Sequence, residues 1–480
     1  MRRPVAARDY PSGTFDAAPA PLEGVVLAAL TDEGLDVDTS APTRAEHGRD
    51  WWPVSLLEVG AGRVPVWPGV VVRAHSESQV EATLRVASRF AVPVTAQGGR
   101  SSVVGGAQPR PGGIALDLTG LNAIGPIDVV SGLVEVGAGV FGPDLDEALA
   151  THSLTLGHLP QSFEISTVGG WLACRGAGQY SNRYGTAADL VRGLHVTLAN
   201  GTSLALGARA PRAAVGPDLT QVFLGSEGTL GVITSATLVA RARPSYDERL
   251  AYGVASFASG LDVCRRILRR GASPAVLRLY DEIEAERLFG VSQGVLLVLD
   301  EGEPTLVGAT MSLVAHEAAS LQPLDPALVA HWLEHRNDVS ALADLWARGV
   351  VVDTIEVAAP WAALATLSDQ VLDALRRREG TVVASVHQSH AYLDGACLYF
   401  TFAGLSEEPL AYYRAAWDAA MEIARVHGAI SHHHGVGHNR ARFARAALGD
   451  SFGVLEGLKT FLDPQGIMNP GVLALGGVPW

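Results

Sequence analysis

Cysteine, signal-peptide features and long apolar runs are scarce in this sequence, and each absence excludes a class of protein. The three cysteines, Cys174, Cys264 and Cys397, are odd in number and far apart, which argues against a disulfide scaffold and for a reducing compartment. No apolar segment follows the basic N-terminus as a signal peptide requires, and no run reaches the roughly 18 apolar residues of a membrane span. We therefore expect a cytoplasmic protein without a transmembrane segment, for which peripheral membrane contact stays open.

Positive charge is also in short supply. The 36 lysines and arginines face 50 aspartates and glutamates, so the formal net charge is −14. Such a balance argues against nucleic-acid binding, although it leaves room for a local basic pocket that binds an acidic ligand. The 48% hydrophobic content can fill a large interior, and a chain of 480 residues is expected to form roughly two to four domains.

Histidine and glycine, by contrast, are concentrated in residues 431–440, Ser-His-His-His-Gly-Val-Gly-His-Asn-Arg. His432, His433, His434 and His438 place four imidazoles, which titrate near neutral pH, on one short segment. Taken alone, the segment suits an active-site loop about as well as a histidine-rich structural turn. Metal binding is disfavoured because adjacent side chains point in different directions, whereas zinc ligands converge. We therefore expect no metal.

The first half of the chain alternates strands and helices. A Ser78-x-x-Glu81 capping box is expected to open one helix. A second helix is expected over residues 144–152. Residues 97–106 and 157–186 are dense in glycine and small residues, which favours a backbone surface shaped around a ligand. Strands are expected at 70–73, 92–95, 114–118 and 133–136, and at 194–198 and 203–206 across an Asn200-Gly201 hairpin turn.

A shift in composition at 241–244 marks the boundary with the second half. There the segment 381–402 predicts a hairpin with a two-residue Asp394-Gly395 turn, which would place His390 opposite Tyr399. Strand alternation would then turn His387 away, so His390 is favoured as the histidine that faces the site. A helix over 410–427 is expected to end with Gly428 in the C′ position, and another over 452–462 is followed by an apolar tail at 467–470.

Three motifs of the first half carry a family resemblance. Gly98 to Gly106, Pro160 to Trp171 and Gly225 to Ile233, in this order and spacing, resemble the flavin-binding half of the vanillyl-alcohol oxidase and p-cresol methylhydroxylase type of FAD enzyme. The resemblance implies an α+β fold: a bipartite FAD-binding domain of two α+β subdomains, and a cap domain built on an antiparallel sheet flanked by helices. The expected division is an N-terminal arm with lead-in helices (1–59), the FAD domain (60–244), the cap (245–427) and a C-terminal histidine-loop segment that completes the FAD domain (428–480).

The same resemblance implies the residues that hold FAD. Related enzymes that tether the flavin covalently have a histidine after the double glycine of the first loop; Arg100 stands there, so we expect non-covalent FAD. The implied cofactor-binding residues are Gly98, Gly99, Arg100, Ser101, Ser102, Pro160, Ser166, Thr167, Gly169, Gly170, Arg175, Gly176, Glu227, Gly228 and Ile233.

Within that superfamily, Ser166 to Trp171, Gly395 to Phe400 and above all Ser431 to Gly437 resemble the alkyldihydroxyacetonephosphate synthase family. This implies exchange of an acyl for an alkyl group on a dihydroxyacetone phosphate ester, a step of ether-lipid synthesis, through a transient flavin adduct. Tyr399 would be the catalytic tyrosine and His432, His433 and His434 the catalytic histidines, acting as proton carriers. A small-molecule or lipid-like substrate and a homodimer are expected.

One departure keeps a second function open. The family's phosphate-gripping arginine is replaced by Ala343, a change that removes a bidentate ligand. Arg278, Arg336 or Arg348 would have to substitute, with His390 also binding substrate. Alternatively the protein is an FAD-linked oxidase or dehydrogenase of a small hydroxylated substrate such as a D-2-hydroxy acid. The tail 466–470 resembles the corresponding segment of the FAD-linked 2-hydroxy-acid dehydrogenases. A flavin protein without catalysis ranks last, because the tyrosine and the histidines are retained.

Overall fold

The computed structural model describes residues 18–207, 210–337, 345–346 and 348–477. Its first unit is a four-stranded sheet in the order β1-β2-β4-β3, in which β2, β4 and β3 run parallel. Alternating buried residues of these strands, among them Val70, Ile114 and Leu116, pack on α1 and α4. The elements are α1 (Gly24–Asp32), β1 (Asp36–Asp38), α2 (Ala41–His47), α3 (Pro53–Gly60), β2 (Val70–Arg73), α4 (Glu77–Phe90), β3 (Val94–Gln97) and β4 (Ile114–Asp117).

The second unit is a five-stranded antiparallel sheet in the order β5-β6-β10-β8-β9. Strands β7 and β11 form a separate antiparallel pair. The elements are β5 (Ile124–Asp128), β6 (Leu133–Gly137), α5 (Gly142–Ala150), β7 (Leu154–Thr155), α6 (Val168–Ala173), α7 (Ser181–Tyr184), α8 (Ala187–Leu190), β8 (Val191–Thr197), β9 (Ser203–Gly207), α9 (Thr220–Phe223), β10 (Val232–Val239) and β11 (Arg241–Ala242).

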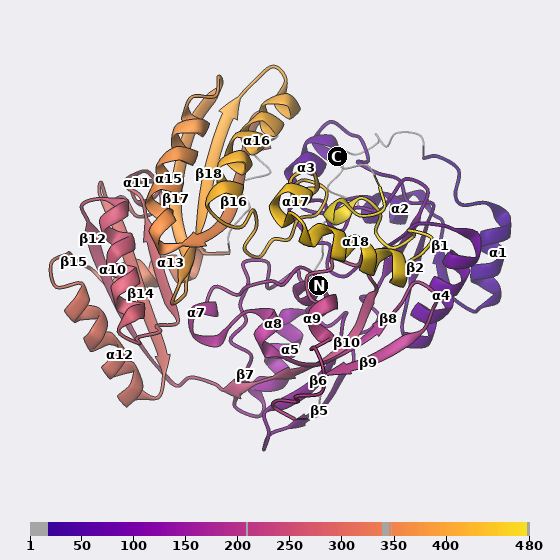
Figure 1. Cartoon of the computed structure of the whole chain (residues 1–480), viewed down its shortest axis with the longest axis horizontal. Helices are drawn as coiled ribbons and strands as arrows, with labels where there is room; N and C mark the ends of the chain where they lie inside the picture. Colours follow the sequence, from indigo (N-terminus) through magenta and orange to yellow (C-terminus); the bar gives the residue numbers. More distant parts are fainter. Residues whose placement is uncertain (1–17, 208–209, 338–344, 347, 478–480) are drawn as a thin grey trace.

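The third unit is a seven-stranded antiparallel sheet in the order β15-β12-β14-β13-β17-β18-β16, drawn in salmon and orange in Figure 1. One face packs on α10, α12, α15 and α16, whereas the other meets Tyr180 and Tyr184 of the second unit. The elements are β12 (Tyr246–Val254), α10 (Phe257–Arg269), β13 (Val276–Tyr280), α11 (Glu282–Phe289), β14 (Gly294–Gly302), α12 (Pro304–Glu317), β15 (Gln322–Leu324), α13 (Ala327–His335), β16 (Val350–Pro360), α15 (Trp361–Arg376), β17 (Thr381–Ala391), β18 (Gly395–Leu405) and α16 (Pro409–His427).

The C-terminal segment returns to the first two units. It contains α17 (Ala441–Leu448), α18 (Ser451–Leu462) and the short 3-10 turn η2 (Val472–Ala474), drawn in yellow in Figure 1. The tail pairs with β3: the amide of Val94 donates to Ile467, and the amide of Asn469 donates to Val94. Buried Ile467 and Met468 therefore extend the core of the first sheet.

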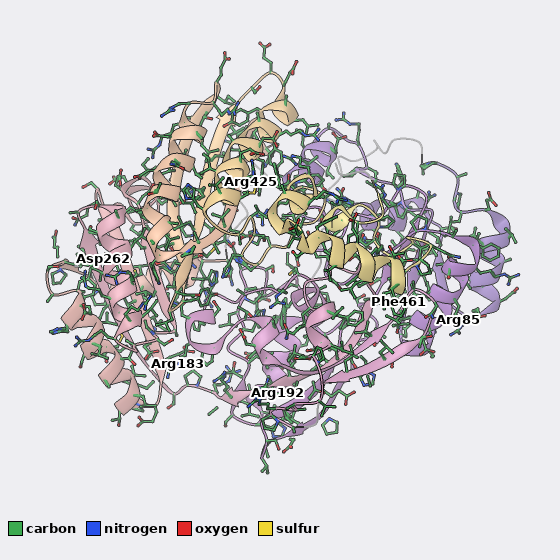
Figure 2. All side chains as sticks on the ribbon, viewed as in Figure 1. Arg85, Arg183, Arg192, Asp262, Arg425 and Phe461 are labelled. Atoms are coloured by element: carbon green, nitrogen blue, oxygen red, sulfur yellow. The ribbon has the colours of Figure 1, made fainter. Side chains whose placement is uncertain are left out.

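The junction between the second and third units includes a direct ion pair. Arg183 of α7 lies 2.6 Å from the buried carboxylate of Asp300 in β14, and Figure 2 shows Arg183 where these units meet. No helix within the described residues combines the length and apolar character needed to cross a membrane.

This architecture confirms the predicted fold class, with an antiparallel cap and a bipartite α+β half. Some local expectations were wrong. The helix α4 begins at Glu77 with Ser76 as its N-cap, rather than at Ser78, because the Ser76 hydroxyl accepts the amide of Gln79. Gly428 ends α16 in an extended conformation (φ −179°), not in the left-handed C′ conformation.

Candidate functional site

The histidine-rich segment is organised by a carboxylate on the neighbouring strand. Glu356 of β16, which is 0% exposed, accepts hydrogen bonds from the hydroxyl of Ser431 (2.8 Å) and the amide of His434 (3.0 Å). The amide of His432 also donates to it, and Arg440 forms a buried ion pair with it at 2.7 Å. One carboxylate thus holds both ends of the loop 431–440 against β16.

Glu356 is ionised at neutral pH. Burial alone would raise its pKa, but the charge of Arg440 and the nearby imidazoles outweighs burial and holds the pKa well below its usual range. No motif in the sequence marks this residue, and sequence reasoning missed it. The only signal is a lone carboxylate within a strand of otherwise mainly apolar residues, 355–359.

Tyr399 lies at the centre of the site. Its position on β18 faces Glu356 across the β16–β18 pairing. The hydroxyl lies 2.6 Å from Nε2 of His433 and 3.1 Å from Nε2 of His434. Burial raises the pKa of the Tyr399 phenol well above 10, and burial lowers the pKa of His434 to about 4 and that of His433 well below 6.5. A neutral phenol therefore faces neutral imidazoles, which can accept the hydrogen bond of the Tyr399 hydroxyl.

A chain of polar groups continues from this tyrosine. Nδ1 of His433 lies 2.7 Å from Nδ1 of His432, and Nε2 of His432 lies 2.9 Å from the hydroxyl of Tyr392. Tyr392 in turn lies 3.1 Å from the hydroxyl of Ser181, which lies 2.7 Å from Nδ1 of His390. Tyr392 and Ser181 were not predicted, because only the folded chain brings α7 beside this loop.

The predicted pairing of His390 with Tyr399 is wrong. His387 is the residue opposite Tyr399, with the two rings nearly parallel (8°) and 4.9 Å apart, whereas His390 pairs with Cys397. The connection is longer than the expected two residues, with the amide of Tyr392 donating to Gly395, and the register shifts between Gln388 and His390. This bulge breaks the alternation, so that both histidines contact the cluster instead of facing opposite sides.

The residues proposed from the sequence to bind substrate lie at the other end of His387. Arg278 of β13 donates from Nη2 to Nε2 of His387 (3.0 Å), and Nδ1 of His387 lies 2.7 Å from the carboxylate of Glu284. Arg336, at the end of α13, lies against the rings of Tyr180 and Trp332. Arg348 is exposed, and Ala343 lies outside the described residues.

Two of the segments predicted to bind FAD lie against each other, and their role in binding stays a prediction. A Cβ on Gly98 would lie 2.1 Å from Oγ1 of Thr167, and one on Gly99 would lie 1.9 Å from the carbonyl oxygen of Ile165. The buried hydroxyl of Thr167 has no hydrogen-bond partner among the described residues. A loop stripped of side chains beside an unpaired hydroxyl suits the phosphate or ribityl groups of FAD.

Glu227 joins this region to the histidine loop. Its carboxylate accepts the amides of Val436 (2.7 Å) and Gly437 (2.8 Å), and its own amide donates to Ala173. The side chain of Asn469 donates to the carbonyl oxygens of Glu227 and Gly106. Burial raises the pKa of Glu227 to about 7. The loop, two FAD segments and the tail thus share one set of hydrogen bonds.

Two of the predicted FAD residues have side chains directed elsewhere. The buried guanidinium of Arg100 lies 3.1 Å from Glu46 and beside His47, and that of Arg175 is exposed and donates to Gln221. Both have backbones in the left-handed region, with φ of 54° and 56°. Only their backbones are therefore available to line the predicted cofactor path.

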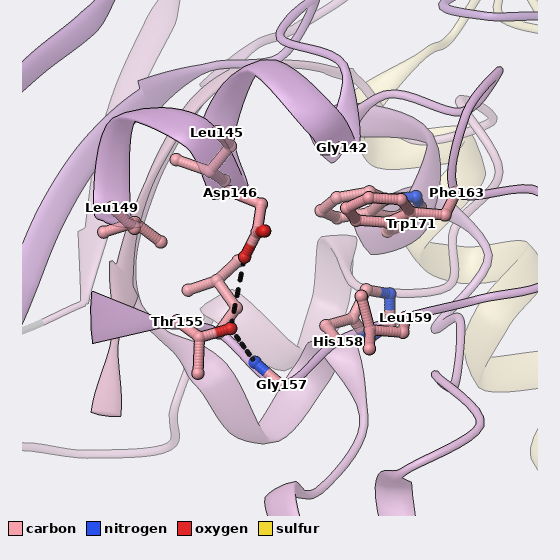
Figure 3. Close-up of a pocket in the computed structure, with 11 residues that line it drawn as sticks. Gly142, Leu145, Asp146, Leu149, Thr155, Gly157, His158, Leu159, Phe163 and Trp171 are labelled. Atoms are coloured by element: carbon pink, nitrogen blue, oxygen red, sulfur yellow. Dashed lines mark hydrogen bonds between the residues drawn. The ribbon is translucent and has the colours of Figure 1, made fainter. Parts of the chain in front are cut away.

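A small pocket lies beside the segment 160–171 (Figure 3). Its walls are mainly apolar, and the carboxylate of Asp146 and the hydroxyl of Thr155 meet at its edge. His158 lines it, with neither ring nitrogen hydrogen-bonded within the described chain and its ring 4.7 Å from that of Trp171. Burial lowers the pKa of His158 to about 3, so this histidine is neutral.

The histidine cluster also brings potential ligand atoms close together. Those of His390, His432 and His433 lie within 4.8 Å of one another, as do those of Glu356, Cys397 and His433. Adjacent histidines alone were expected to diverge, but His390, which lies on β17, brings a third ligand atom close to those of His432 and His433. The absence of a metal stays a prediction.

Comparison with known protein families identifies both halves of the chain. Residues 68–207 match the FAD binding domain profile and residues 243–473 match the profile of the C-terminal domain of FAD linked oxidases. These matches establish FAD as the cofactor and support an enzyme.

Similar curated proteins include both predicted types of enzyme. An uncharacterized FAD-linked oxidoreductase, YgcU of Escherichia coli K12, is 29% identical over 430 residues, covering 85% of this chain and 89% of the relative. Alkyldihydroxyacetonephosphate synthase of Dictyostelium discoideum is 29% identical over 460 residues, covering 86% and 74%. Glycolate oxidase subunit GlcD of Bacillus subtilis is 26% identical over 421 residues, covering 84% and 88%.

Solved structures show the same fold. A structure of alkyldihydroxyacetonephosphate synthase superposes with a TM-score of 0.79 at 24% identity, covering 98% of this chain and 88% of the other. One of p-cresol methylhydroxylase with bound substrate gives a TM-score of 0.74 at 14% identity, covering 95% and 98%.

Proposed function

We propose, for a chain that belongs to the FAD-linked oxidases, that it exchanges an acyl for an alkyl group on an ester of dihydroxyacetone phosphate. The observation that carries the proposal is the hydroxyl of Tyr399 within hydrogen-bond distance of His433 and His434. The alkyldihydroxyacetonephosphate synthases of Dictyostelium discoideum and Trypanosoma brucei brucei, 29% and 28% identical to this chain, support it.

The residues of the site suit proton transfer at a substrate carbon. Bound FAD supplies a redox-active, electrophilic ring at which that carbon reacts. As the Tyr399 oxygen takes a proton from the substrate carbon, which keeps the electron pair, Tyr399 can pass its own hydroxyl proton to the neutral Nε2 of His433, and the reverse transfers return both protons. Through His432, the path to Tyr392 and Ser181 spreads the proton over several groups, while Glu356 fixes the loop that carries the imidazoles.

An exchange assay tests this function. The FAD-loaded protein is incubated with an acyl dihydroxyacetone phosphate and a long-chain alcohol, and the alkyl product and released fatty acid are measured by mass spectrometry. Tyr399→Phe keeps the ring beside His387 but removes the hydroxyl, so we expect a rate roughly 10²- to 10⁴-fold lower at unchanged FAD content. Wild-type protein with a full complement of FAD that forms no alkyl product would refute the exchange.

A second candidate is oxidation of a small D-2-hydroxy acid. Ala343 in place of the phosphate-binding arginine favours it, and the GlcD relative is named as a glycolate oxidase subunit. Anaerobic mixing with D-2-hydroxy acids would bleach the oxidised flavin absorbance in this case. A flavin that stays oxidised with every acid excludes the candidate.

We also propose the remaining properties expected from the sequence: non-covalent FAD, a cytoplasmic homodimer, a small or lipid-like substrate and domains at 1–59, 60–244, 245–427 and 428–480. Arg100 at the position of the tethering histidine supports non-covalent binding. Flavin that stays with the acid-precipitated protein would contradict it. A mass of one chain in light scattering would contradict the dimer. Localisation of a tagged chain tests the cytoplasmic compartment. Cleavage in limited proteolysis at sites away from the proposed boundaries would contradict the domain division.

A further inference from the structure

Arg278 is an almost buried cation whose hydrogen-bond partners among the described residues are neutral. It is 7% exposed, its Nε donates to the hydroxyl of Tyr280 (3.0 Å), and its Nη2 donates to His387 (3.0 Å). Burial lowers the pKa of His387, and Nδ1–H of this neutral ring donates to Glu284, which leaves Nε2 free to accept from Arg278. A guanidinium has five N–H donors, so several donors of Arg278 remain unused.

Arg336 is a second cation of the same kind beside the first. Its Nη1 donates to the amide oxygen of Gln179 (2.9 Å), and its guanidinium lies 5.2 Å from the ring centre of Tyr180. Both arginines lie against the indole of Trp332, at 5.1 Å for Arg278 and 5.4 Å for Arg336. One aromatic ring therefore positions two guanidiniums.

Neither arginine forms an ion pair with a carboxylate of the described residues. Among the other buried arginines, Arg440 is paired with Glu356 and Arg100 with Glu46, whereas Arg44 donates to three backbone carbonyl oxygens. Stacking on an aromatic ring contributes only about 0.5–2 kcal/mol, less than the several kcal/mol that desolvation of an ion costs. Two like charges held together in this way call for an anion that no described residue supplies.

The position of this pair relates it to the reacting group. Arg278 contacts His387, the ring of His387 is stacked at 4.9 Å on that of Tyr399, and the hydroxyl of Tyr399 contacts His433. The single imidazole ring of His387 therefore connects Arg278 to the ring of Tyr399.

We propose that Arg278 and Arg336, held on Trp332, form the subsite that binds the oxyanion of the substrate, a phosphate or a carboxylate, and so places its reacting carbon beside Tyr399. This inference rests on the proposed function in taking the Tyr399 cluster as the reacting site. It assigns to β13 and α13 the role that the missing arginine at Ala343 has in the synthases. The planar forks of two guanidiniums match the oxygens of either anion.

Binding of simple anions to the FAD-loaded full chain tests the subsite. Inorganic phosphate and acetate are titrated at constant ionic strength, with binding followed by calorimetry and by the flavin difference spectrum. We expect saturable binding of one anion class, which names the oxyanion. Arg278→Met and Arg336→Met should each weaken it roughly 10- to 100-fold, the effect of losing a charge-assisted hydrogen bond. Arg336→Lys should lie between, because it keeps the charge but not the fork.

Arg377→Met is the matched control, because Arg377, the C-cap residue of α15 in the same cap, is 78% exposed, and this variant should bind anions as the wild type does. FAD content and circular dichroism are recorded for each variant; if Arg278→Met does not fold, the two variants of the more exposed Arg336 decide. A wild type that binds neither anion, or arginine variants that bind as well as the wild type, overturn the inference. Intact anion binding without alkyl exchange would instead reject only the proposed reaction.

Discussion

At the scale of single residues, Glu356 determines where the histidines of the loop 431–440 lie. It is the shared acceptor for Ser431, two loop amides and the buried guanidinium of Arg440. Because Arg440 is 0% exposed, loss of the carboxylate charge leaves an uncompensated cation in the interior. The geometry of the loop and the stability of the fold therefore depend on the same carboxylate.

Glu356→Gln tests this dependence with little change of shape. We expect the free energy of unfolding to fall by about 3–5 kcal/mol, the range for breaking a buried pair, and turnover to fall with it. Urea denaturation with constant m-value measures the change. Glu422→Gln is the control: Glu422 pairs with Arg425 on the surface of α16, where the loss should stay below about 1 kcal/mol. Equal losses for both variants would contradict the role of Glu356.

The sequence reveals the residues of this site unequally. Tyr399 and the three histidines were found because they belong to contiguous motifs, and the structure brings them together. Glu356, Tyr392 and Ser181 lie in unremarkable local sequence, and each acquires its role only from a partner far away in the chain. Site residues that belong to one contiguous motif can be predicted from the sequence, whereas site residues that only the fold brings together cannot.

At the scale of elements, the junction of α16 with the histidine loop is the most constrained position of the site. A Cβ on Gly428 would lie 2.1 Å from the carbonyl oxygen of Ala358 in β16. The next residue, Ala429, exchanges two backbone hydrogen bonds with Ala358. Glycine was expected here for a left-handed cap, but the structure shows that close approach to a strand requires it.

Gly428→Ala should therefore displace the histidine loop from β16. We expect a loss of about 1–3 kcal/mol in unfolding free energy, as for overpacking, and a lower turnover. Gly308→Ala in α12 is the control, because nothing lies within 4 Å of its Cβ position and alanine favours a helix by roughly 0.5–1 kcal/mol. Thermal denaturation of the two variants should shift in opposite directions; a stabilised Gly428→Ala protein would contradict the account.

The hairpin β17–β18 shows why element existence was easier to predict than register. Both strands were expected from alternation and from the turn residues, and both are present. The longer turn and the bulge next to His390 moved the partner of Tyr399 from His390 to His387. A bulge leaves almost no local signal, yet it decides which side chain reaches the site.

At the scale of the whole molecule, the two halves and the C-terminus meet at the segments predicted to bind FAD. The fold was predictable because three glycine-rich motifs and their spacing carry it, and the tail was rightly expected to pack, as Asn469 shows by joining Glu227 to Gly106. The pKa values of the buried titratable groups have no such sequence motif, because the burial that shifts them arises only in the folded chain. The balance of these shifts determines how the stability of the protein depends on pH.

Lowered histidine pKa values dominate this balance. They are lowered, chiefly by burial, for His47, His158, His387, His390, His432, His433, His434 and His438. Below pH 6.5 the unfolded chain binds protons at these sites that the folded chain does not, so stability falls with falling pH. Burial raises the pKa values of Asp50 and Glu227 to about 7, and these two groups have the opposite effect on stability. Their contribution to the stability of the protein is lost as pH rises from about 4 to 7.

Because the histidines are more numerous, we expect stability to be greatest near neutral pH and to decline below about pH 6, which urea denaturation at a series of pH values measures. His158→Leu isolates one contribution, since His158 has a pKa of about 3 and, within the described part of the chain, no hydrogen-bond partner to lose. This variant should be at least as stable as the wild type at pH 7, and between pH 6 and 4 its stability should fall by about 1.4 kcal/mol less per pH unit, the effect of one proton. A pH dependence identical to that of the wild type would show that His158 is charged in the folded protein.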